Sequence, residues 1–128
     1  MKRPPLVMIV DDATDNREGY AQYLQFCGFR TLEAATGEEA LKLAQRARPD
    51  VILLDMRLPG LPGGEVSRRL RAAGFETTPI IALSACTFES DIAAAMESGC
   101  DSFLSKPCLP ESVVGEIKRL LKAPRVAS

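Results

Sequence analysis

The stretch PDVILLDM at residues 49–56 places a continuous apolar run directly before an acidic residue, Asp55. A run of this kind, without alternation of polar and apolar residues, is typical of a strand that is buried on both faces of a parallel sheet. Two other stretches, LVMIVDD from residue 6 and IIALS from residue 80, have the same form. The predicted buried strands are therefore 6–10, 51–54 and 80–83.

Two weaker and more polar runs, at 30–34 and 102–104, complete the set of strands, and their polarity suits the edges of a sheet. Helical patterns separate the successive runs, so that strand and helix alternate five times along the chain. This alternation predicts an α/β fold with a doubly wound five-stranded parallel sheet, right-handed crossovers and helices on both faces.

The helix signals are clearest after the second strand and near the end of the sequence. Thr36 and Glu39 form a capping box, in which the Thr36 hydroxyl caps a helix and Glu39 reaches back. Pro110 suits the first turn of the last helix. The apolar stripe of that helix consists of Val113, Val114, Ile117, Leu120 and Leu121. The other three helices are expected to end at Gly28, Gly74 and Gly99.

The composition is that of an ordinary globular protein, and we expect one domain, 1–128, with a core at about 6–121 and a short tail at 122–128. Apolar residues make up 46% and charged residues 26%, which excludes a disordered or fibrous chain. The formal net charge of −1 argues against direct binding of nucleic acid or of an anionic membrane. The basic residues of two predicted helices are expected on solvated faces: Arg68, Arg69, Arg71, Lys118, Arg119 and Lys122.

Nothing in the sequence indicates insertion into a membrane. No apolar run approaches the roughly 18 residues of a membrane span, and the N-terminal segment is too short and too quickly acidic for a signal peptide. The four cysteines form no CxxC pair, which excludes a zinc ribbon and a thioredoxin motif. We expect a cytoplasmic protein in which the thiols are free, at Cys27, Cys86, Cys100 and Cys108.

Polar side chains stand where the predicted strands end: Asp11, Asp12, Asp55, Ser84 and Lys106. Ligands of doubly wound sheets bind beyond the carboxyl ends of the strands, so these residues are expected on one rim. Like charges ~4 Å apart repel by about 4 kcal/mol at an effective dielectric constant of about 20. The three carboxylates therefore call for a divalent cation. Mg²⁺ suits them best, because it takes one or two carboxylates and leaves positions for phosphate oxygens.

The same rim is suited to phosphoryl chemistry, because an aspartate beside Mg²⁺ and a lysine can attack phosphorus. Histidine is absent from the chain, which excludes Ser-His-Asp catalysis, a histidine metal ligand and a phosphohistidine of its own. A phosphoryl group held by histidine would have to come from another chain.

This set of residues, with the stretches around it, resembles the receiver domain of two-component response regulators. The resemblance runs from about residue 6 to residue 121 and rests on motifs in a fixed order. They are VDD at 10–12, NR at 16–17, PDVILLDM at 49–56, LPG at 58–60, ALSA at 82–85 and GCDSFLSKP at 99–107. The resemblance implies the strand order 2-1-3-4-5 of flavodoxin-like folds.

The resemblance also implies roles for single residues. Asp55 would accept a phosphoryl group from a histidine kinase or a histidine phosphotransfer protein. Asp12 would bind Mg²⁺ directly and Asp11 chiefly through water, with Asp55 and the backbone carbonyl of Arg57 as further ligands. The only catalysis would be the Mg²⁺-dependent phosphorylation and dephosphorylation of Asp55, so the protein would be a signalling switch and not an enzyme with a free substrate.

Three more residues would convert phosphorylation into a change of surface. Lys106 would pair with the Asp55 carboxylate and then with the phosphoryl oxygens, and its bond to Pro107 is expected to be cis. Ser84 would donate its hydroxyl to the phosphoryl group, and Phe103 would follow into the vacated space. The changed surface, on the fourth helix, fifth strand and fifth helix, would be read by a downstream protein. Any exposed part of the last helix's stripe could also serve a homodimer.

The sequence departs from the family pattern at four positions. Phe103 stands where many relatives have tyrosine, so no hydroxyl is available at that switch position. Pro62 replaces a familiar acidic residue seven positions after Asp55 and should stiffen the loop. Arg57 and Cys86 occupy positions that overlook the phosphoryl group in this family and tune its hydrolysis.

Other functions fit less well. A flavodoxin-like flavin site would need a phosphate cradle after the first strand, where Asp11 and Asp12 would repel the phosphate. A haloacid-dehalogenase-type phosphatase would need an aspartate where Arg57 stands, and the nucleotide-binding motifs GxxxxGK and GxGxxG are absent. The alternative that stays open is a receiver-like interaction module that acts without phosphorylation.

Overall fold

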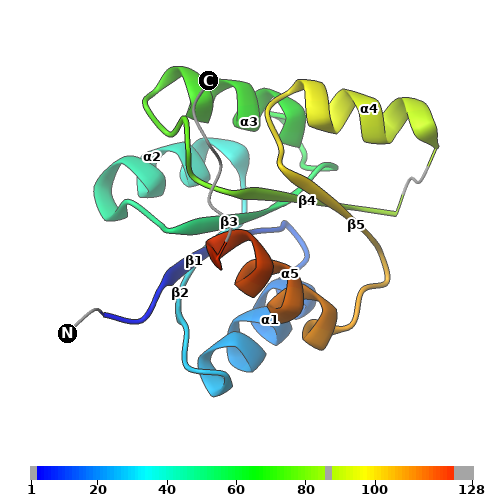
Figure 1. The fold of residues 1–128 in the computed structure, drawn as a ribbon. Coiled ribbons are helices and arrows are strands. Elements are labelled where there is room, and N and C mark those ends of the chain that lie inside the picture. Colours follow the sequence, from blue (N-terminus) through cyan, green and yellow to red (C-terminus); the bar gives the residue numbers. More distant parts are fainter. Residues whose placement is uncertain (1–2, 86–87, 123–128) are drawn as a thin grey trace.

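Five parallel strands form the centre of the molecule in the computed structural model, which describes residues 3–85 and 88–122 (Figure 1). The strands are β1 (Leu6–Val10), β2 (Arg30–Ala34), β3 (Val51–Asp55), β4 (Ile80–Ser84) and β5 (Ser102–Ser105). Their order is β2-β1-β3-β4-β5, which confirms both the predicted α/β class and the implied strand order. The two polar strands, β2 and β5, lie at the edges as predicted.

In the described part of the chain, five helices cover the sheet: α1 (Thr14–Phe26), α2 (Gly37–Ala47), α3 (Gly63–Ala72), α4 (Glu89–Glu97) and α5 (Pro110–Lys122). Figure 1 shows α1 and α5 on one face of the sheet, and α2, α3 and α4 on the other. Val7 and Ile9 of β1 belong to the core beneath α1 and α5, whereas Met8 and Val10 belong to the core beneath α2, α3 and α4. Both faces of the strand are therefore buried, as its continuous apolar run predicts.

The strands that carry the predicted site extend one residue further than the sequence indicated. Asp55 belongs to β3 and pairs with Leu83, and Ser84 belongs to β4 and pairs with Ser105 of β5. The backbones of Asp55 and Ser84 are therefore fixed by the sheet and not by a loop. This register presents both side chains at the carboxyl edge of the sheet.

The predicted helix ends are confirmed with one refinement. The Thr36 hydroxyl accepts a hydrogen bond from the Glu39 backbone N–H at 3.1 Å, so Thr36 caps α2. The Glu39 carboxylate reaches back to the backbone N–H of Ala35, at 2.7 Å, instead of that of Thr36. The glycines after α1, α3 and α4 have φ values of 96°, 106° and 111°, in the left-handed region that favours glycine; they are Gly28, Gly74 and Gly99.

The apolar stripe of α5 faces the core as predicted, with Leu121 half-buried and its other members buried. Among the basic residues, five are exposed as expected: Arg68, Arg69, Lys118, Arg119 and Lys122. Three cysteines, Cys27, Cys100 and Cys108, are free thiols, and Cys86 lies outside the described residues.

The expectation for the sixth basic residue, Arg71, is wrong. Its side chain is only 14% exposed, and its guanidinium lies 2.8 Å from the Asp101 carboxylate. The same guanidinium donates hydrogen bonds to the backbone carbonyls of Phe75, Thr78 and Gly99. Asp101 also accepts a hydrogen bond from the backbone N–H of Ile80 at 2.9 Å. We call this group the Arg71 cluster; it ties the end of α3 to the start of β4 and to the turn after α4.

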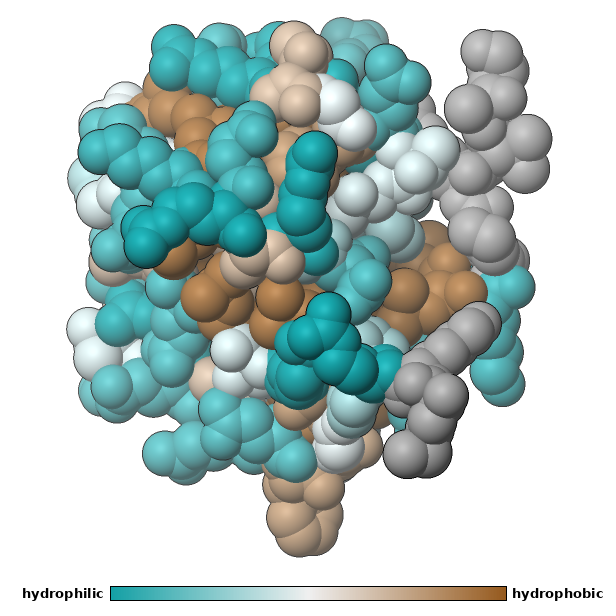
Figure 2. Space-filling model, turned by 90° about the vertical axis from the view of Figure 1, so that its left-hand side faces the viewer, coloured by the Kyte–Doolittle hydropathy of each residue, from teal (hydrophilic) through white to brown (hydrophobic). Residues whose placement is uncertain are grey.

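No helix in residues 3–85 and 88–122 is long and apolar enough to cross a membrane. The face shown in Figure 2 is predominantly hydrophilic, with apolar patches between its polar residues.

Candidate functional site

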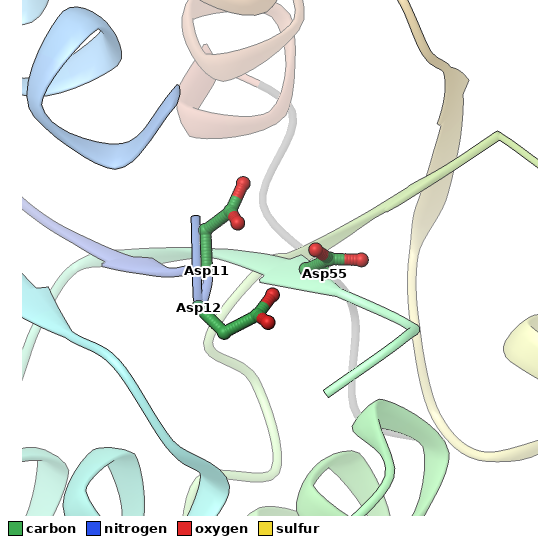
Figure 3. A group of neighbouring side chains, drawn as sticks. All are labelled: Asp11, Asp12 and Asp55. Carbon is green, nitrogen blue, oxygen red and sulfur yellow. The ribbon is translucent and has the colours of Figure 1, made fainter. Parts of the chain in front are cut away.

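Three carboxylates meet at the carboxyl edge of the sheet, where the sequence predicted them. Asp11 and Asp12 follow β1, and Asp55 ends β3 (Figure 3). One oxygen of each carboxylate lies within 4.8 Å of an oxygen of the other two. Asp11 is completely buried, Asp55 is 5% exposed and Asp12 is exposed, so the acidic group opens to solvent on the Asp12 side.

Lys106 joins two of these carboxylates. Its ammonium lies 3.0 Å from Oδ2 of Asp55 and 3.2 Å from Oδ2 of Asp11. Among the described residues, one ammonium therefore pairs directly with two carboxylates of a group of three. Because like charges repel strongly at these separations, the site attracts a further cation.

The loop after β5 holds Lys106 in this position. The backbone N–H of Lys106 donates to the carbonyl of Ser84 at 2.8 Å, and its bond to Pro107 is cis, as expected. From α1, the Tyr20 hydroxyl donates to the carbonyl of Cys108 at 3.3 Å. Tyr20 was not predicted to take part, because its sequence position indicates only a buried helix residue.

Each oxygen of Asp55 has a donor. Oδ1 accepts the backbone N–H of Arg57 at 2.9 Å, and Oδ2 accepts Lys106. Burial raises the pKa of Asp55 above its ordinary value, because the hydrogen bonds from Arg57 and Lys106 offset only part of the cost of removing the carboxylate from water. A bound cation would favour the ionised form, which is the form that can attack phosphorus.

The pKa of Lys106 is raised. Burial lowers it, but the hydrogen bond from Lys106 to Asp55 and the charges of Asp55 and Asp11 raise it by more. The lysine is therefore held as an ammonium ion beside Asp55.

The donor set fits Mg²⁺. All the side-chain ligands are carboxylate oxygens, which hard divalent cations prefer, and one face of the group is open for water and phosphate oxygens. Asp11 already accepts hydrogen bonds from Lys106 and from the backbone N–H of Ala13, which suits contact with the ion through water. Asp12 has no hydrogen bond or ion pair to another residue in the described ranges, which suits direct contact. The ligand role of the Arg57 carbonyl stays a prediction.

Ser84 and Phe103 lie together beside the acidic group. Ser84 is buried at the end of β4, and Phe103 is half-buried on β5. Both line a cavity of about 470 Å³ whose other walls include Met56, Pro62 and Ala94. The cavity provides space on the α4 side of the sheet for a side chain to move. Cys86, predicted to overlook the phosphoryl group, lies outside the described residues.

Sequence reasoning missed Gly63, the first residue of α3. A Cβ atom at this position would stand 2.5 Å from the carbonyl oxygen of Asp55 and 2.7 Å from Cα of Met56. The helix can approach the backbone of β3 only because glycine has no side chain. The paired glycines after Pro62 were the available signal, because glycine has no side chain and so permits a close approach of two backbones.

These features define a flavodoxin-like α/β protein with an acidic site and a lysine at the carboxyl edge of its sheet. Comparison with known proteins agrees: residues 7–118 match the response regulator receiver domain family. The chain therefore belongs to this family and is a receiver domain of two-component signalling.

The relatives include both longer regulators and single receiver domains. The chain is 36% identical over 119 residues to the response regulator MprA of Mycolicibacterium vanbaalenii, covering 93% of this chain and 51% of MprA. It is 37% identical over 118 residues to the transcriptional regulatory protein PrrA of Mycobacterium tuberculosis, covering 92% and 50%. The chain thus spans about half the length of these curated relatives.

Solved structures share the fold over nearly the whole chain. The chemotaxis response regulator CheY4 of Vibrio cholerae superposes with a TM-score of 0.87 at 32% identity, covering 91% of this chain and 98% of CheY4. The receiver domain of the Francisella response regulator 1452 gives a TM-score of 0.87 at 29% identity, covering 93% and 98%.

Proposed function

We propose that this protein is a phosphorylation-dependent signalling switch that accepts a phosphoryl group on Asp55. The observation that carries the proposal is the meeting of a buried Asp55, a paired Lys106 and two further aspartates at the carboxyl edge of the sheet. A purely structural ion pair needs one carboxylate for one ammonium, and this site has three.

In the proposed reaction, an oxygen of Asp55 forms a bond to phosphorus while the bond from phosphorus to the donor breaks. The donor would be a phosphohistidine of a histidine kinase or phosphotransfer protein, whose imidazole nitrogen takes the electron pair of the broken bond. Lys106 would then pair with the phosphoryl oxygens. Its ammonium is close enough for this, since it lies 3.0 Å from the Asp55 carboxylate. No free substrate is consumed, so we infer no enzymatic activity beyond phosphorylation and dephosphorylation of Asp55.

Mg²⁺ is the cofactor that the donor set supports, with Asp12 and Asp55 as direct ligands, Asp11 through water, and the Arg57 carbonyl as a backbone ligand. When bound, the ion would supply charge neutralisation at the phosphoryl oxygens. The residues of the chain then have separate tasks: Asp55 attacks, Lys106 holds the product oxygens, and Asp11 and Asp12 fix the cation.

The output of the switch would be a changed surface on α4, β5 and α5. Ser84 would donate its hydroxyl to the phosphoryl group, and the ring of Phe103 would enter the cavity that both residues line. A downstream protein would recognise this surface. The same surface could also form a homodimer through α5. Phe103 carries no hydroxyl, so recognition would depend on the position of its ring. We do not assign direct nucleic-acid binding to this domain, whose chain has a net charge of −1.

The test is phosphorylation by acetyl phosphate, measured by intact mass with and without Mg²⁺. Wild type is compared with Asp55→Asn and with a matched control, Asp50→Asn. Asp50 lies just before β3, at the other end of the same strand, where its carboxylate accepts the backbone N–H of Leu6. We expect one Mg²⁺-dependent phosphoryl adduct in wild type and in the control, and none in Asp55→Asn.

Two other results would change the conclusion. An adduct that persists in Asp55→Asn would show that another residue accepts the phosphoryl group. If the wild type gains no adduct from acetyl phosphate or from a phosphorylated histidine kinase, and binds no Mg²⁺, the switch is refuted. The protein would then be a receiver-like interaction module that acts without phosphorylation.

A further inference from the structure

Arg17 connects the edge strand β2 to the acidic group. It lies in the first turn of α1 and its side chain is only 15% exposed. Its Nε donates to Oε1 of Glu33 at 3.0 Å, and its Nη1 donates to the backbone carbonyl of Asp11 at 3.0 Å. An arginine can make both contacts at once because its donors are fixed in one plane.

The carbonyl that Arg17 holds belongs to the peptide bond between Asp11 and Asp12. The other polar atoms of Asp11 are also engaged: its N–H donates to the carbonyl of Ala34, and its carboxylate accepts hydrogen bonds from Ala13 and Lys106. Asp12 has no comparable restraint of its own in the described ranges. The peptide plane before Asp12 helps to set where its side chain projects from the backbone, and Arg17 donates a hydrogen bond to the carbonyl of that plane.

We propose that Arg17 is a positioning residue for the acidic cation site, held in place by Glu33. The proposal rests on the proposed function, because it concerns the Mg²⁺ site of that switch. Arg17 does not touch the ion; it sets the peptide from which the Asp12 side chain projects. Partners of this kind, one step removed from the ligands, orient the ligands of metal sites.

A positioning role for Arg17 and the loss of its positive charge predict opposite effects on Mg²⁺ affinity when the residue is removed. Arg17 is positive and lies near a cation site, so removing its charge should by itself strengthen Mg²⁺ binding. If Arg17 positions Asp12, removing it should weaken Mg²⁺ binding. A third possibility, that Arg17 only ties α1 to β2, predicts lower stability with unchanged Mg²⁺ affinity.

The experiment is a Mg²⁺ titration of the full chain, followed by backbone amide chemical shifts, on wild type, Arg17→Ala and Arg17→Lys. The matched control is Arg30→Ala, since Arg30 donates to the carbonyl of Pro4 at 2.9 Å at the opposite end of β2. Thermal unfolding in EDTA measures the stability of each variant separately from its affinity for Mg²⁺.

We expect Arg17→Ala to raise the Mg²⁺ dissociation constant by roughly tenfold or more, as is typical for second-layer partners of metal ligands. Arg17→Lys should also weaken binding, because a single ammonium does not reproduce the two fixed contacts although it keeps the charge. Arg30→Ala should bind Mg²⁺ like wild type.

Equal or tighter binding by both Arg17 variants, with Mg²⁺ binding by wild type intact, overturns the positioning role and leaves the proposed switch standing. If Arg17→Ala does not fold, Arg17→Lys decides between the same outcomes. If wild type itself binds no Mg²⁺, the cation site fails, and the role of Arg17 fails with it.

Discussion

Two cations of this protein are similarly buried, but they stand in opposite electrostatic situations. The side chain of Arg71 is 14% exposed and that of Lys106 is 19% exposed. Among the described residues, Arg71 pairs with the carboxylate of Asp101 and also donates hydrogen bonds to backbone carbonyls. Lys106 faces two carboxylates directly, and a third, that of Asp12, lies in the same group.

The difference distinguishes the Arg71 cluster from the candidate functional site. In the Arg71 cluster, as far as the described residues go, one guanidinium pairs with one carboxylate and donates its other hydrogen bonds to backbone carbonyls. At the Lys106 site the negative charge exceeds the positive charge, and the excess is stable only if a cation or a proton joins it. Ion pairs of similar burial can therefore differ in role. The balance of charge around each pair distinguishes them, and their burial does not.

The largest expected effect is the loss of the Arg71 cluster. Arg71→Ala would remove the guanidinium that pairs with the largely buried Asp101 carboxylate. Breaking a buried ion pair from one side costs about 3–5 kcal/mol of unfolding free energy. Urea unfolding at pH 7 measures this loss. Mg²⁺ affinity, in conditions where the variant is still folded, should stay at the wild-type value, because the cluster lies away from the carboxyl edge of β1 and β3.

A Mg²⁺ affinity that falls with Arg71→Ala would mean that the Arg71 cluster and the acidic site are coupled through the sheet and do not have separate roles. Arg69→Ala is the control for loss of an arginine charge on α3, because Arg69 is exposed and pairs only with Glu65 of its own helix among the described residues. Its removal should change stability by less than about 1 kcal/mol.

Gly63→Ala should cause a loss of stability of intermediate size, and it should also change the phosphorylation rate. The new methyl group would meet backbone atoms of Asp55 and Met56 at 2.5 Å and 2.7 Å, so either α3 or the end of β3 has to shift. We expect a loss of about 1–3 kcal/mol, typical of overpacking, together with slower phosphorylation of Asp55 by acetyl phosphate.

Gly115→Ala is the matched control, because its Cβ would meet nothing within 4 Å and the residue lies inside α5. This variant should gain about 0.5–1 kcal/mol, the usual advantage of alanine over glycine in a helix. Equal rates of phosphorylation in Gly63→Ala and wild type would show that the close approach of α3 does not position Asp55.

The smallest expected effect is a gain of stability that depends on pH, and it is expected for the replacement of Asp55. In EDTA at pH 7, Asp55→Asn should be more stable than wild type, because burial raises the pKa of Asp55 and so makes its ionised form unfavourable in the folded protein. The folded-state pKa lies above the ordinary value of 3.8, so the advantage is complete above the folded pKa and disappears as the pH falls through it towards 3.8. Thermal unfolding of both proteins across this range measures the difference.

Asp50→Asn again serves as the control, because it also removes a carboxylate charge but keeps an oxygen that can accept the backbone N–H of Leu6, so it should not stabilise the protein. A less stable Asp55→Asn at pH 7 would mean that the ion pair with Lys106 outweighs the charge excess. The contrast between the two clusters would then be one of degree only.

The sequence predicts the features that depend on local pattern or on a family motif. Continuous apolar runs identify the buried strands, and the residues that follow them, Asp11, Asp12 and Asp55, identify the acidic edge. Parallel strands bring their carboxyl ends to one side, so a pattern along the chain becomes a cluster in space. The order of the strands came from the family resemblance, because alternation alone does not decide it.

The contacts that sequence reasoning missed join residues far apart in the chain. Arg71 reaches Asp101, thirty positions away, and Arg17 reaches Glu33 across sixteen. Neither pair has a spacing that a helix or strand repeat would indicate. Without its partner in view, each arginine is typical of a solvated helix face. Gly63 was missed because its role depends on how closely α3 approaches β3, which no local pattern specifies.

The most direct test of phosphorylation at Asp55 is to locate the phosphoryl group chemically. The protein is phosphorylated with acetyl phosphate and Mg²⁺ and then reduced with borohydride, which converts an aspartyl phosphate into homoserine, and its peptides are sequenced by mass spectrometry. We expect homoserine at position 55 and at no other aspartate. Homoserine at position 11 or 12, with position 55 unchanged, would contradict this expectation.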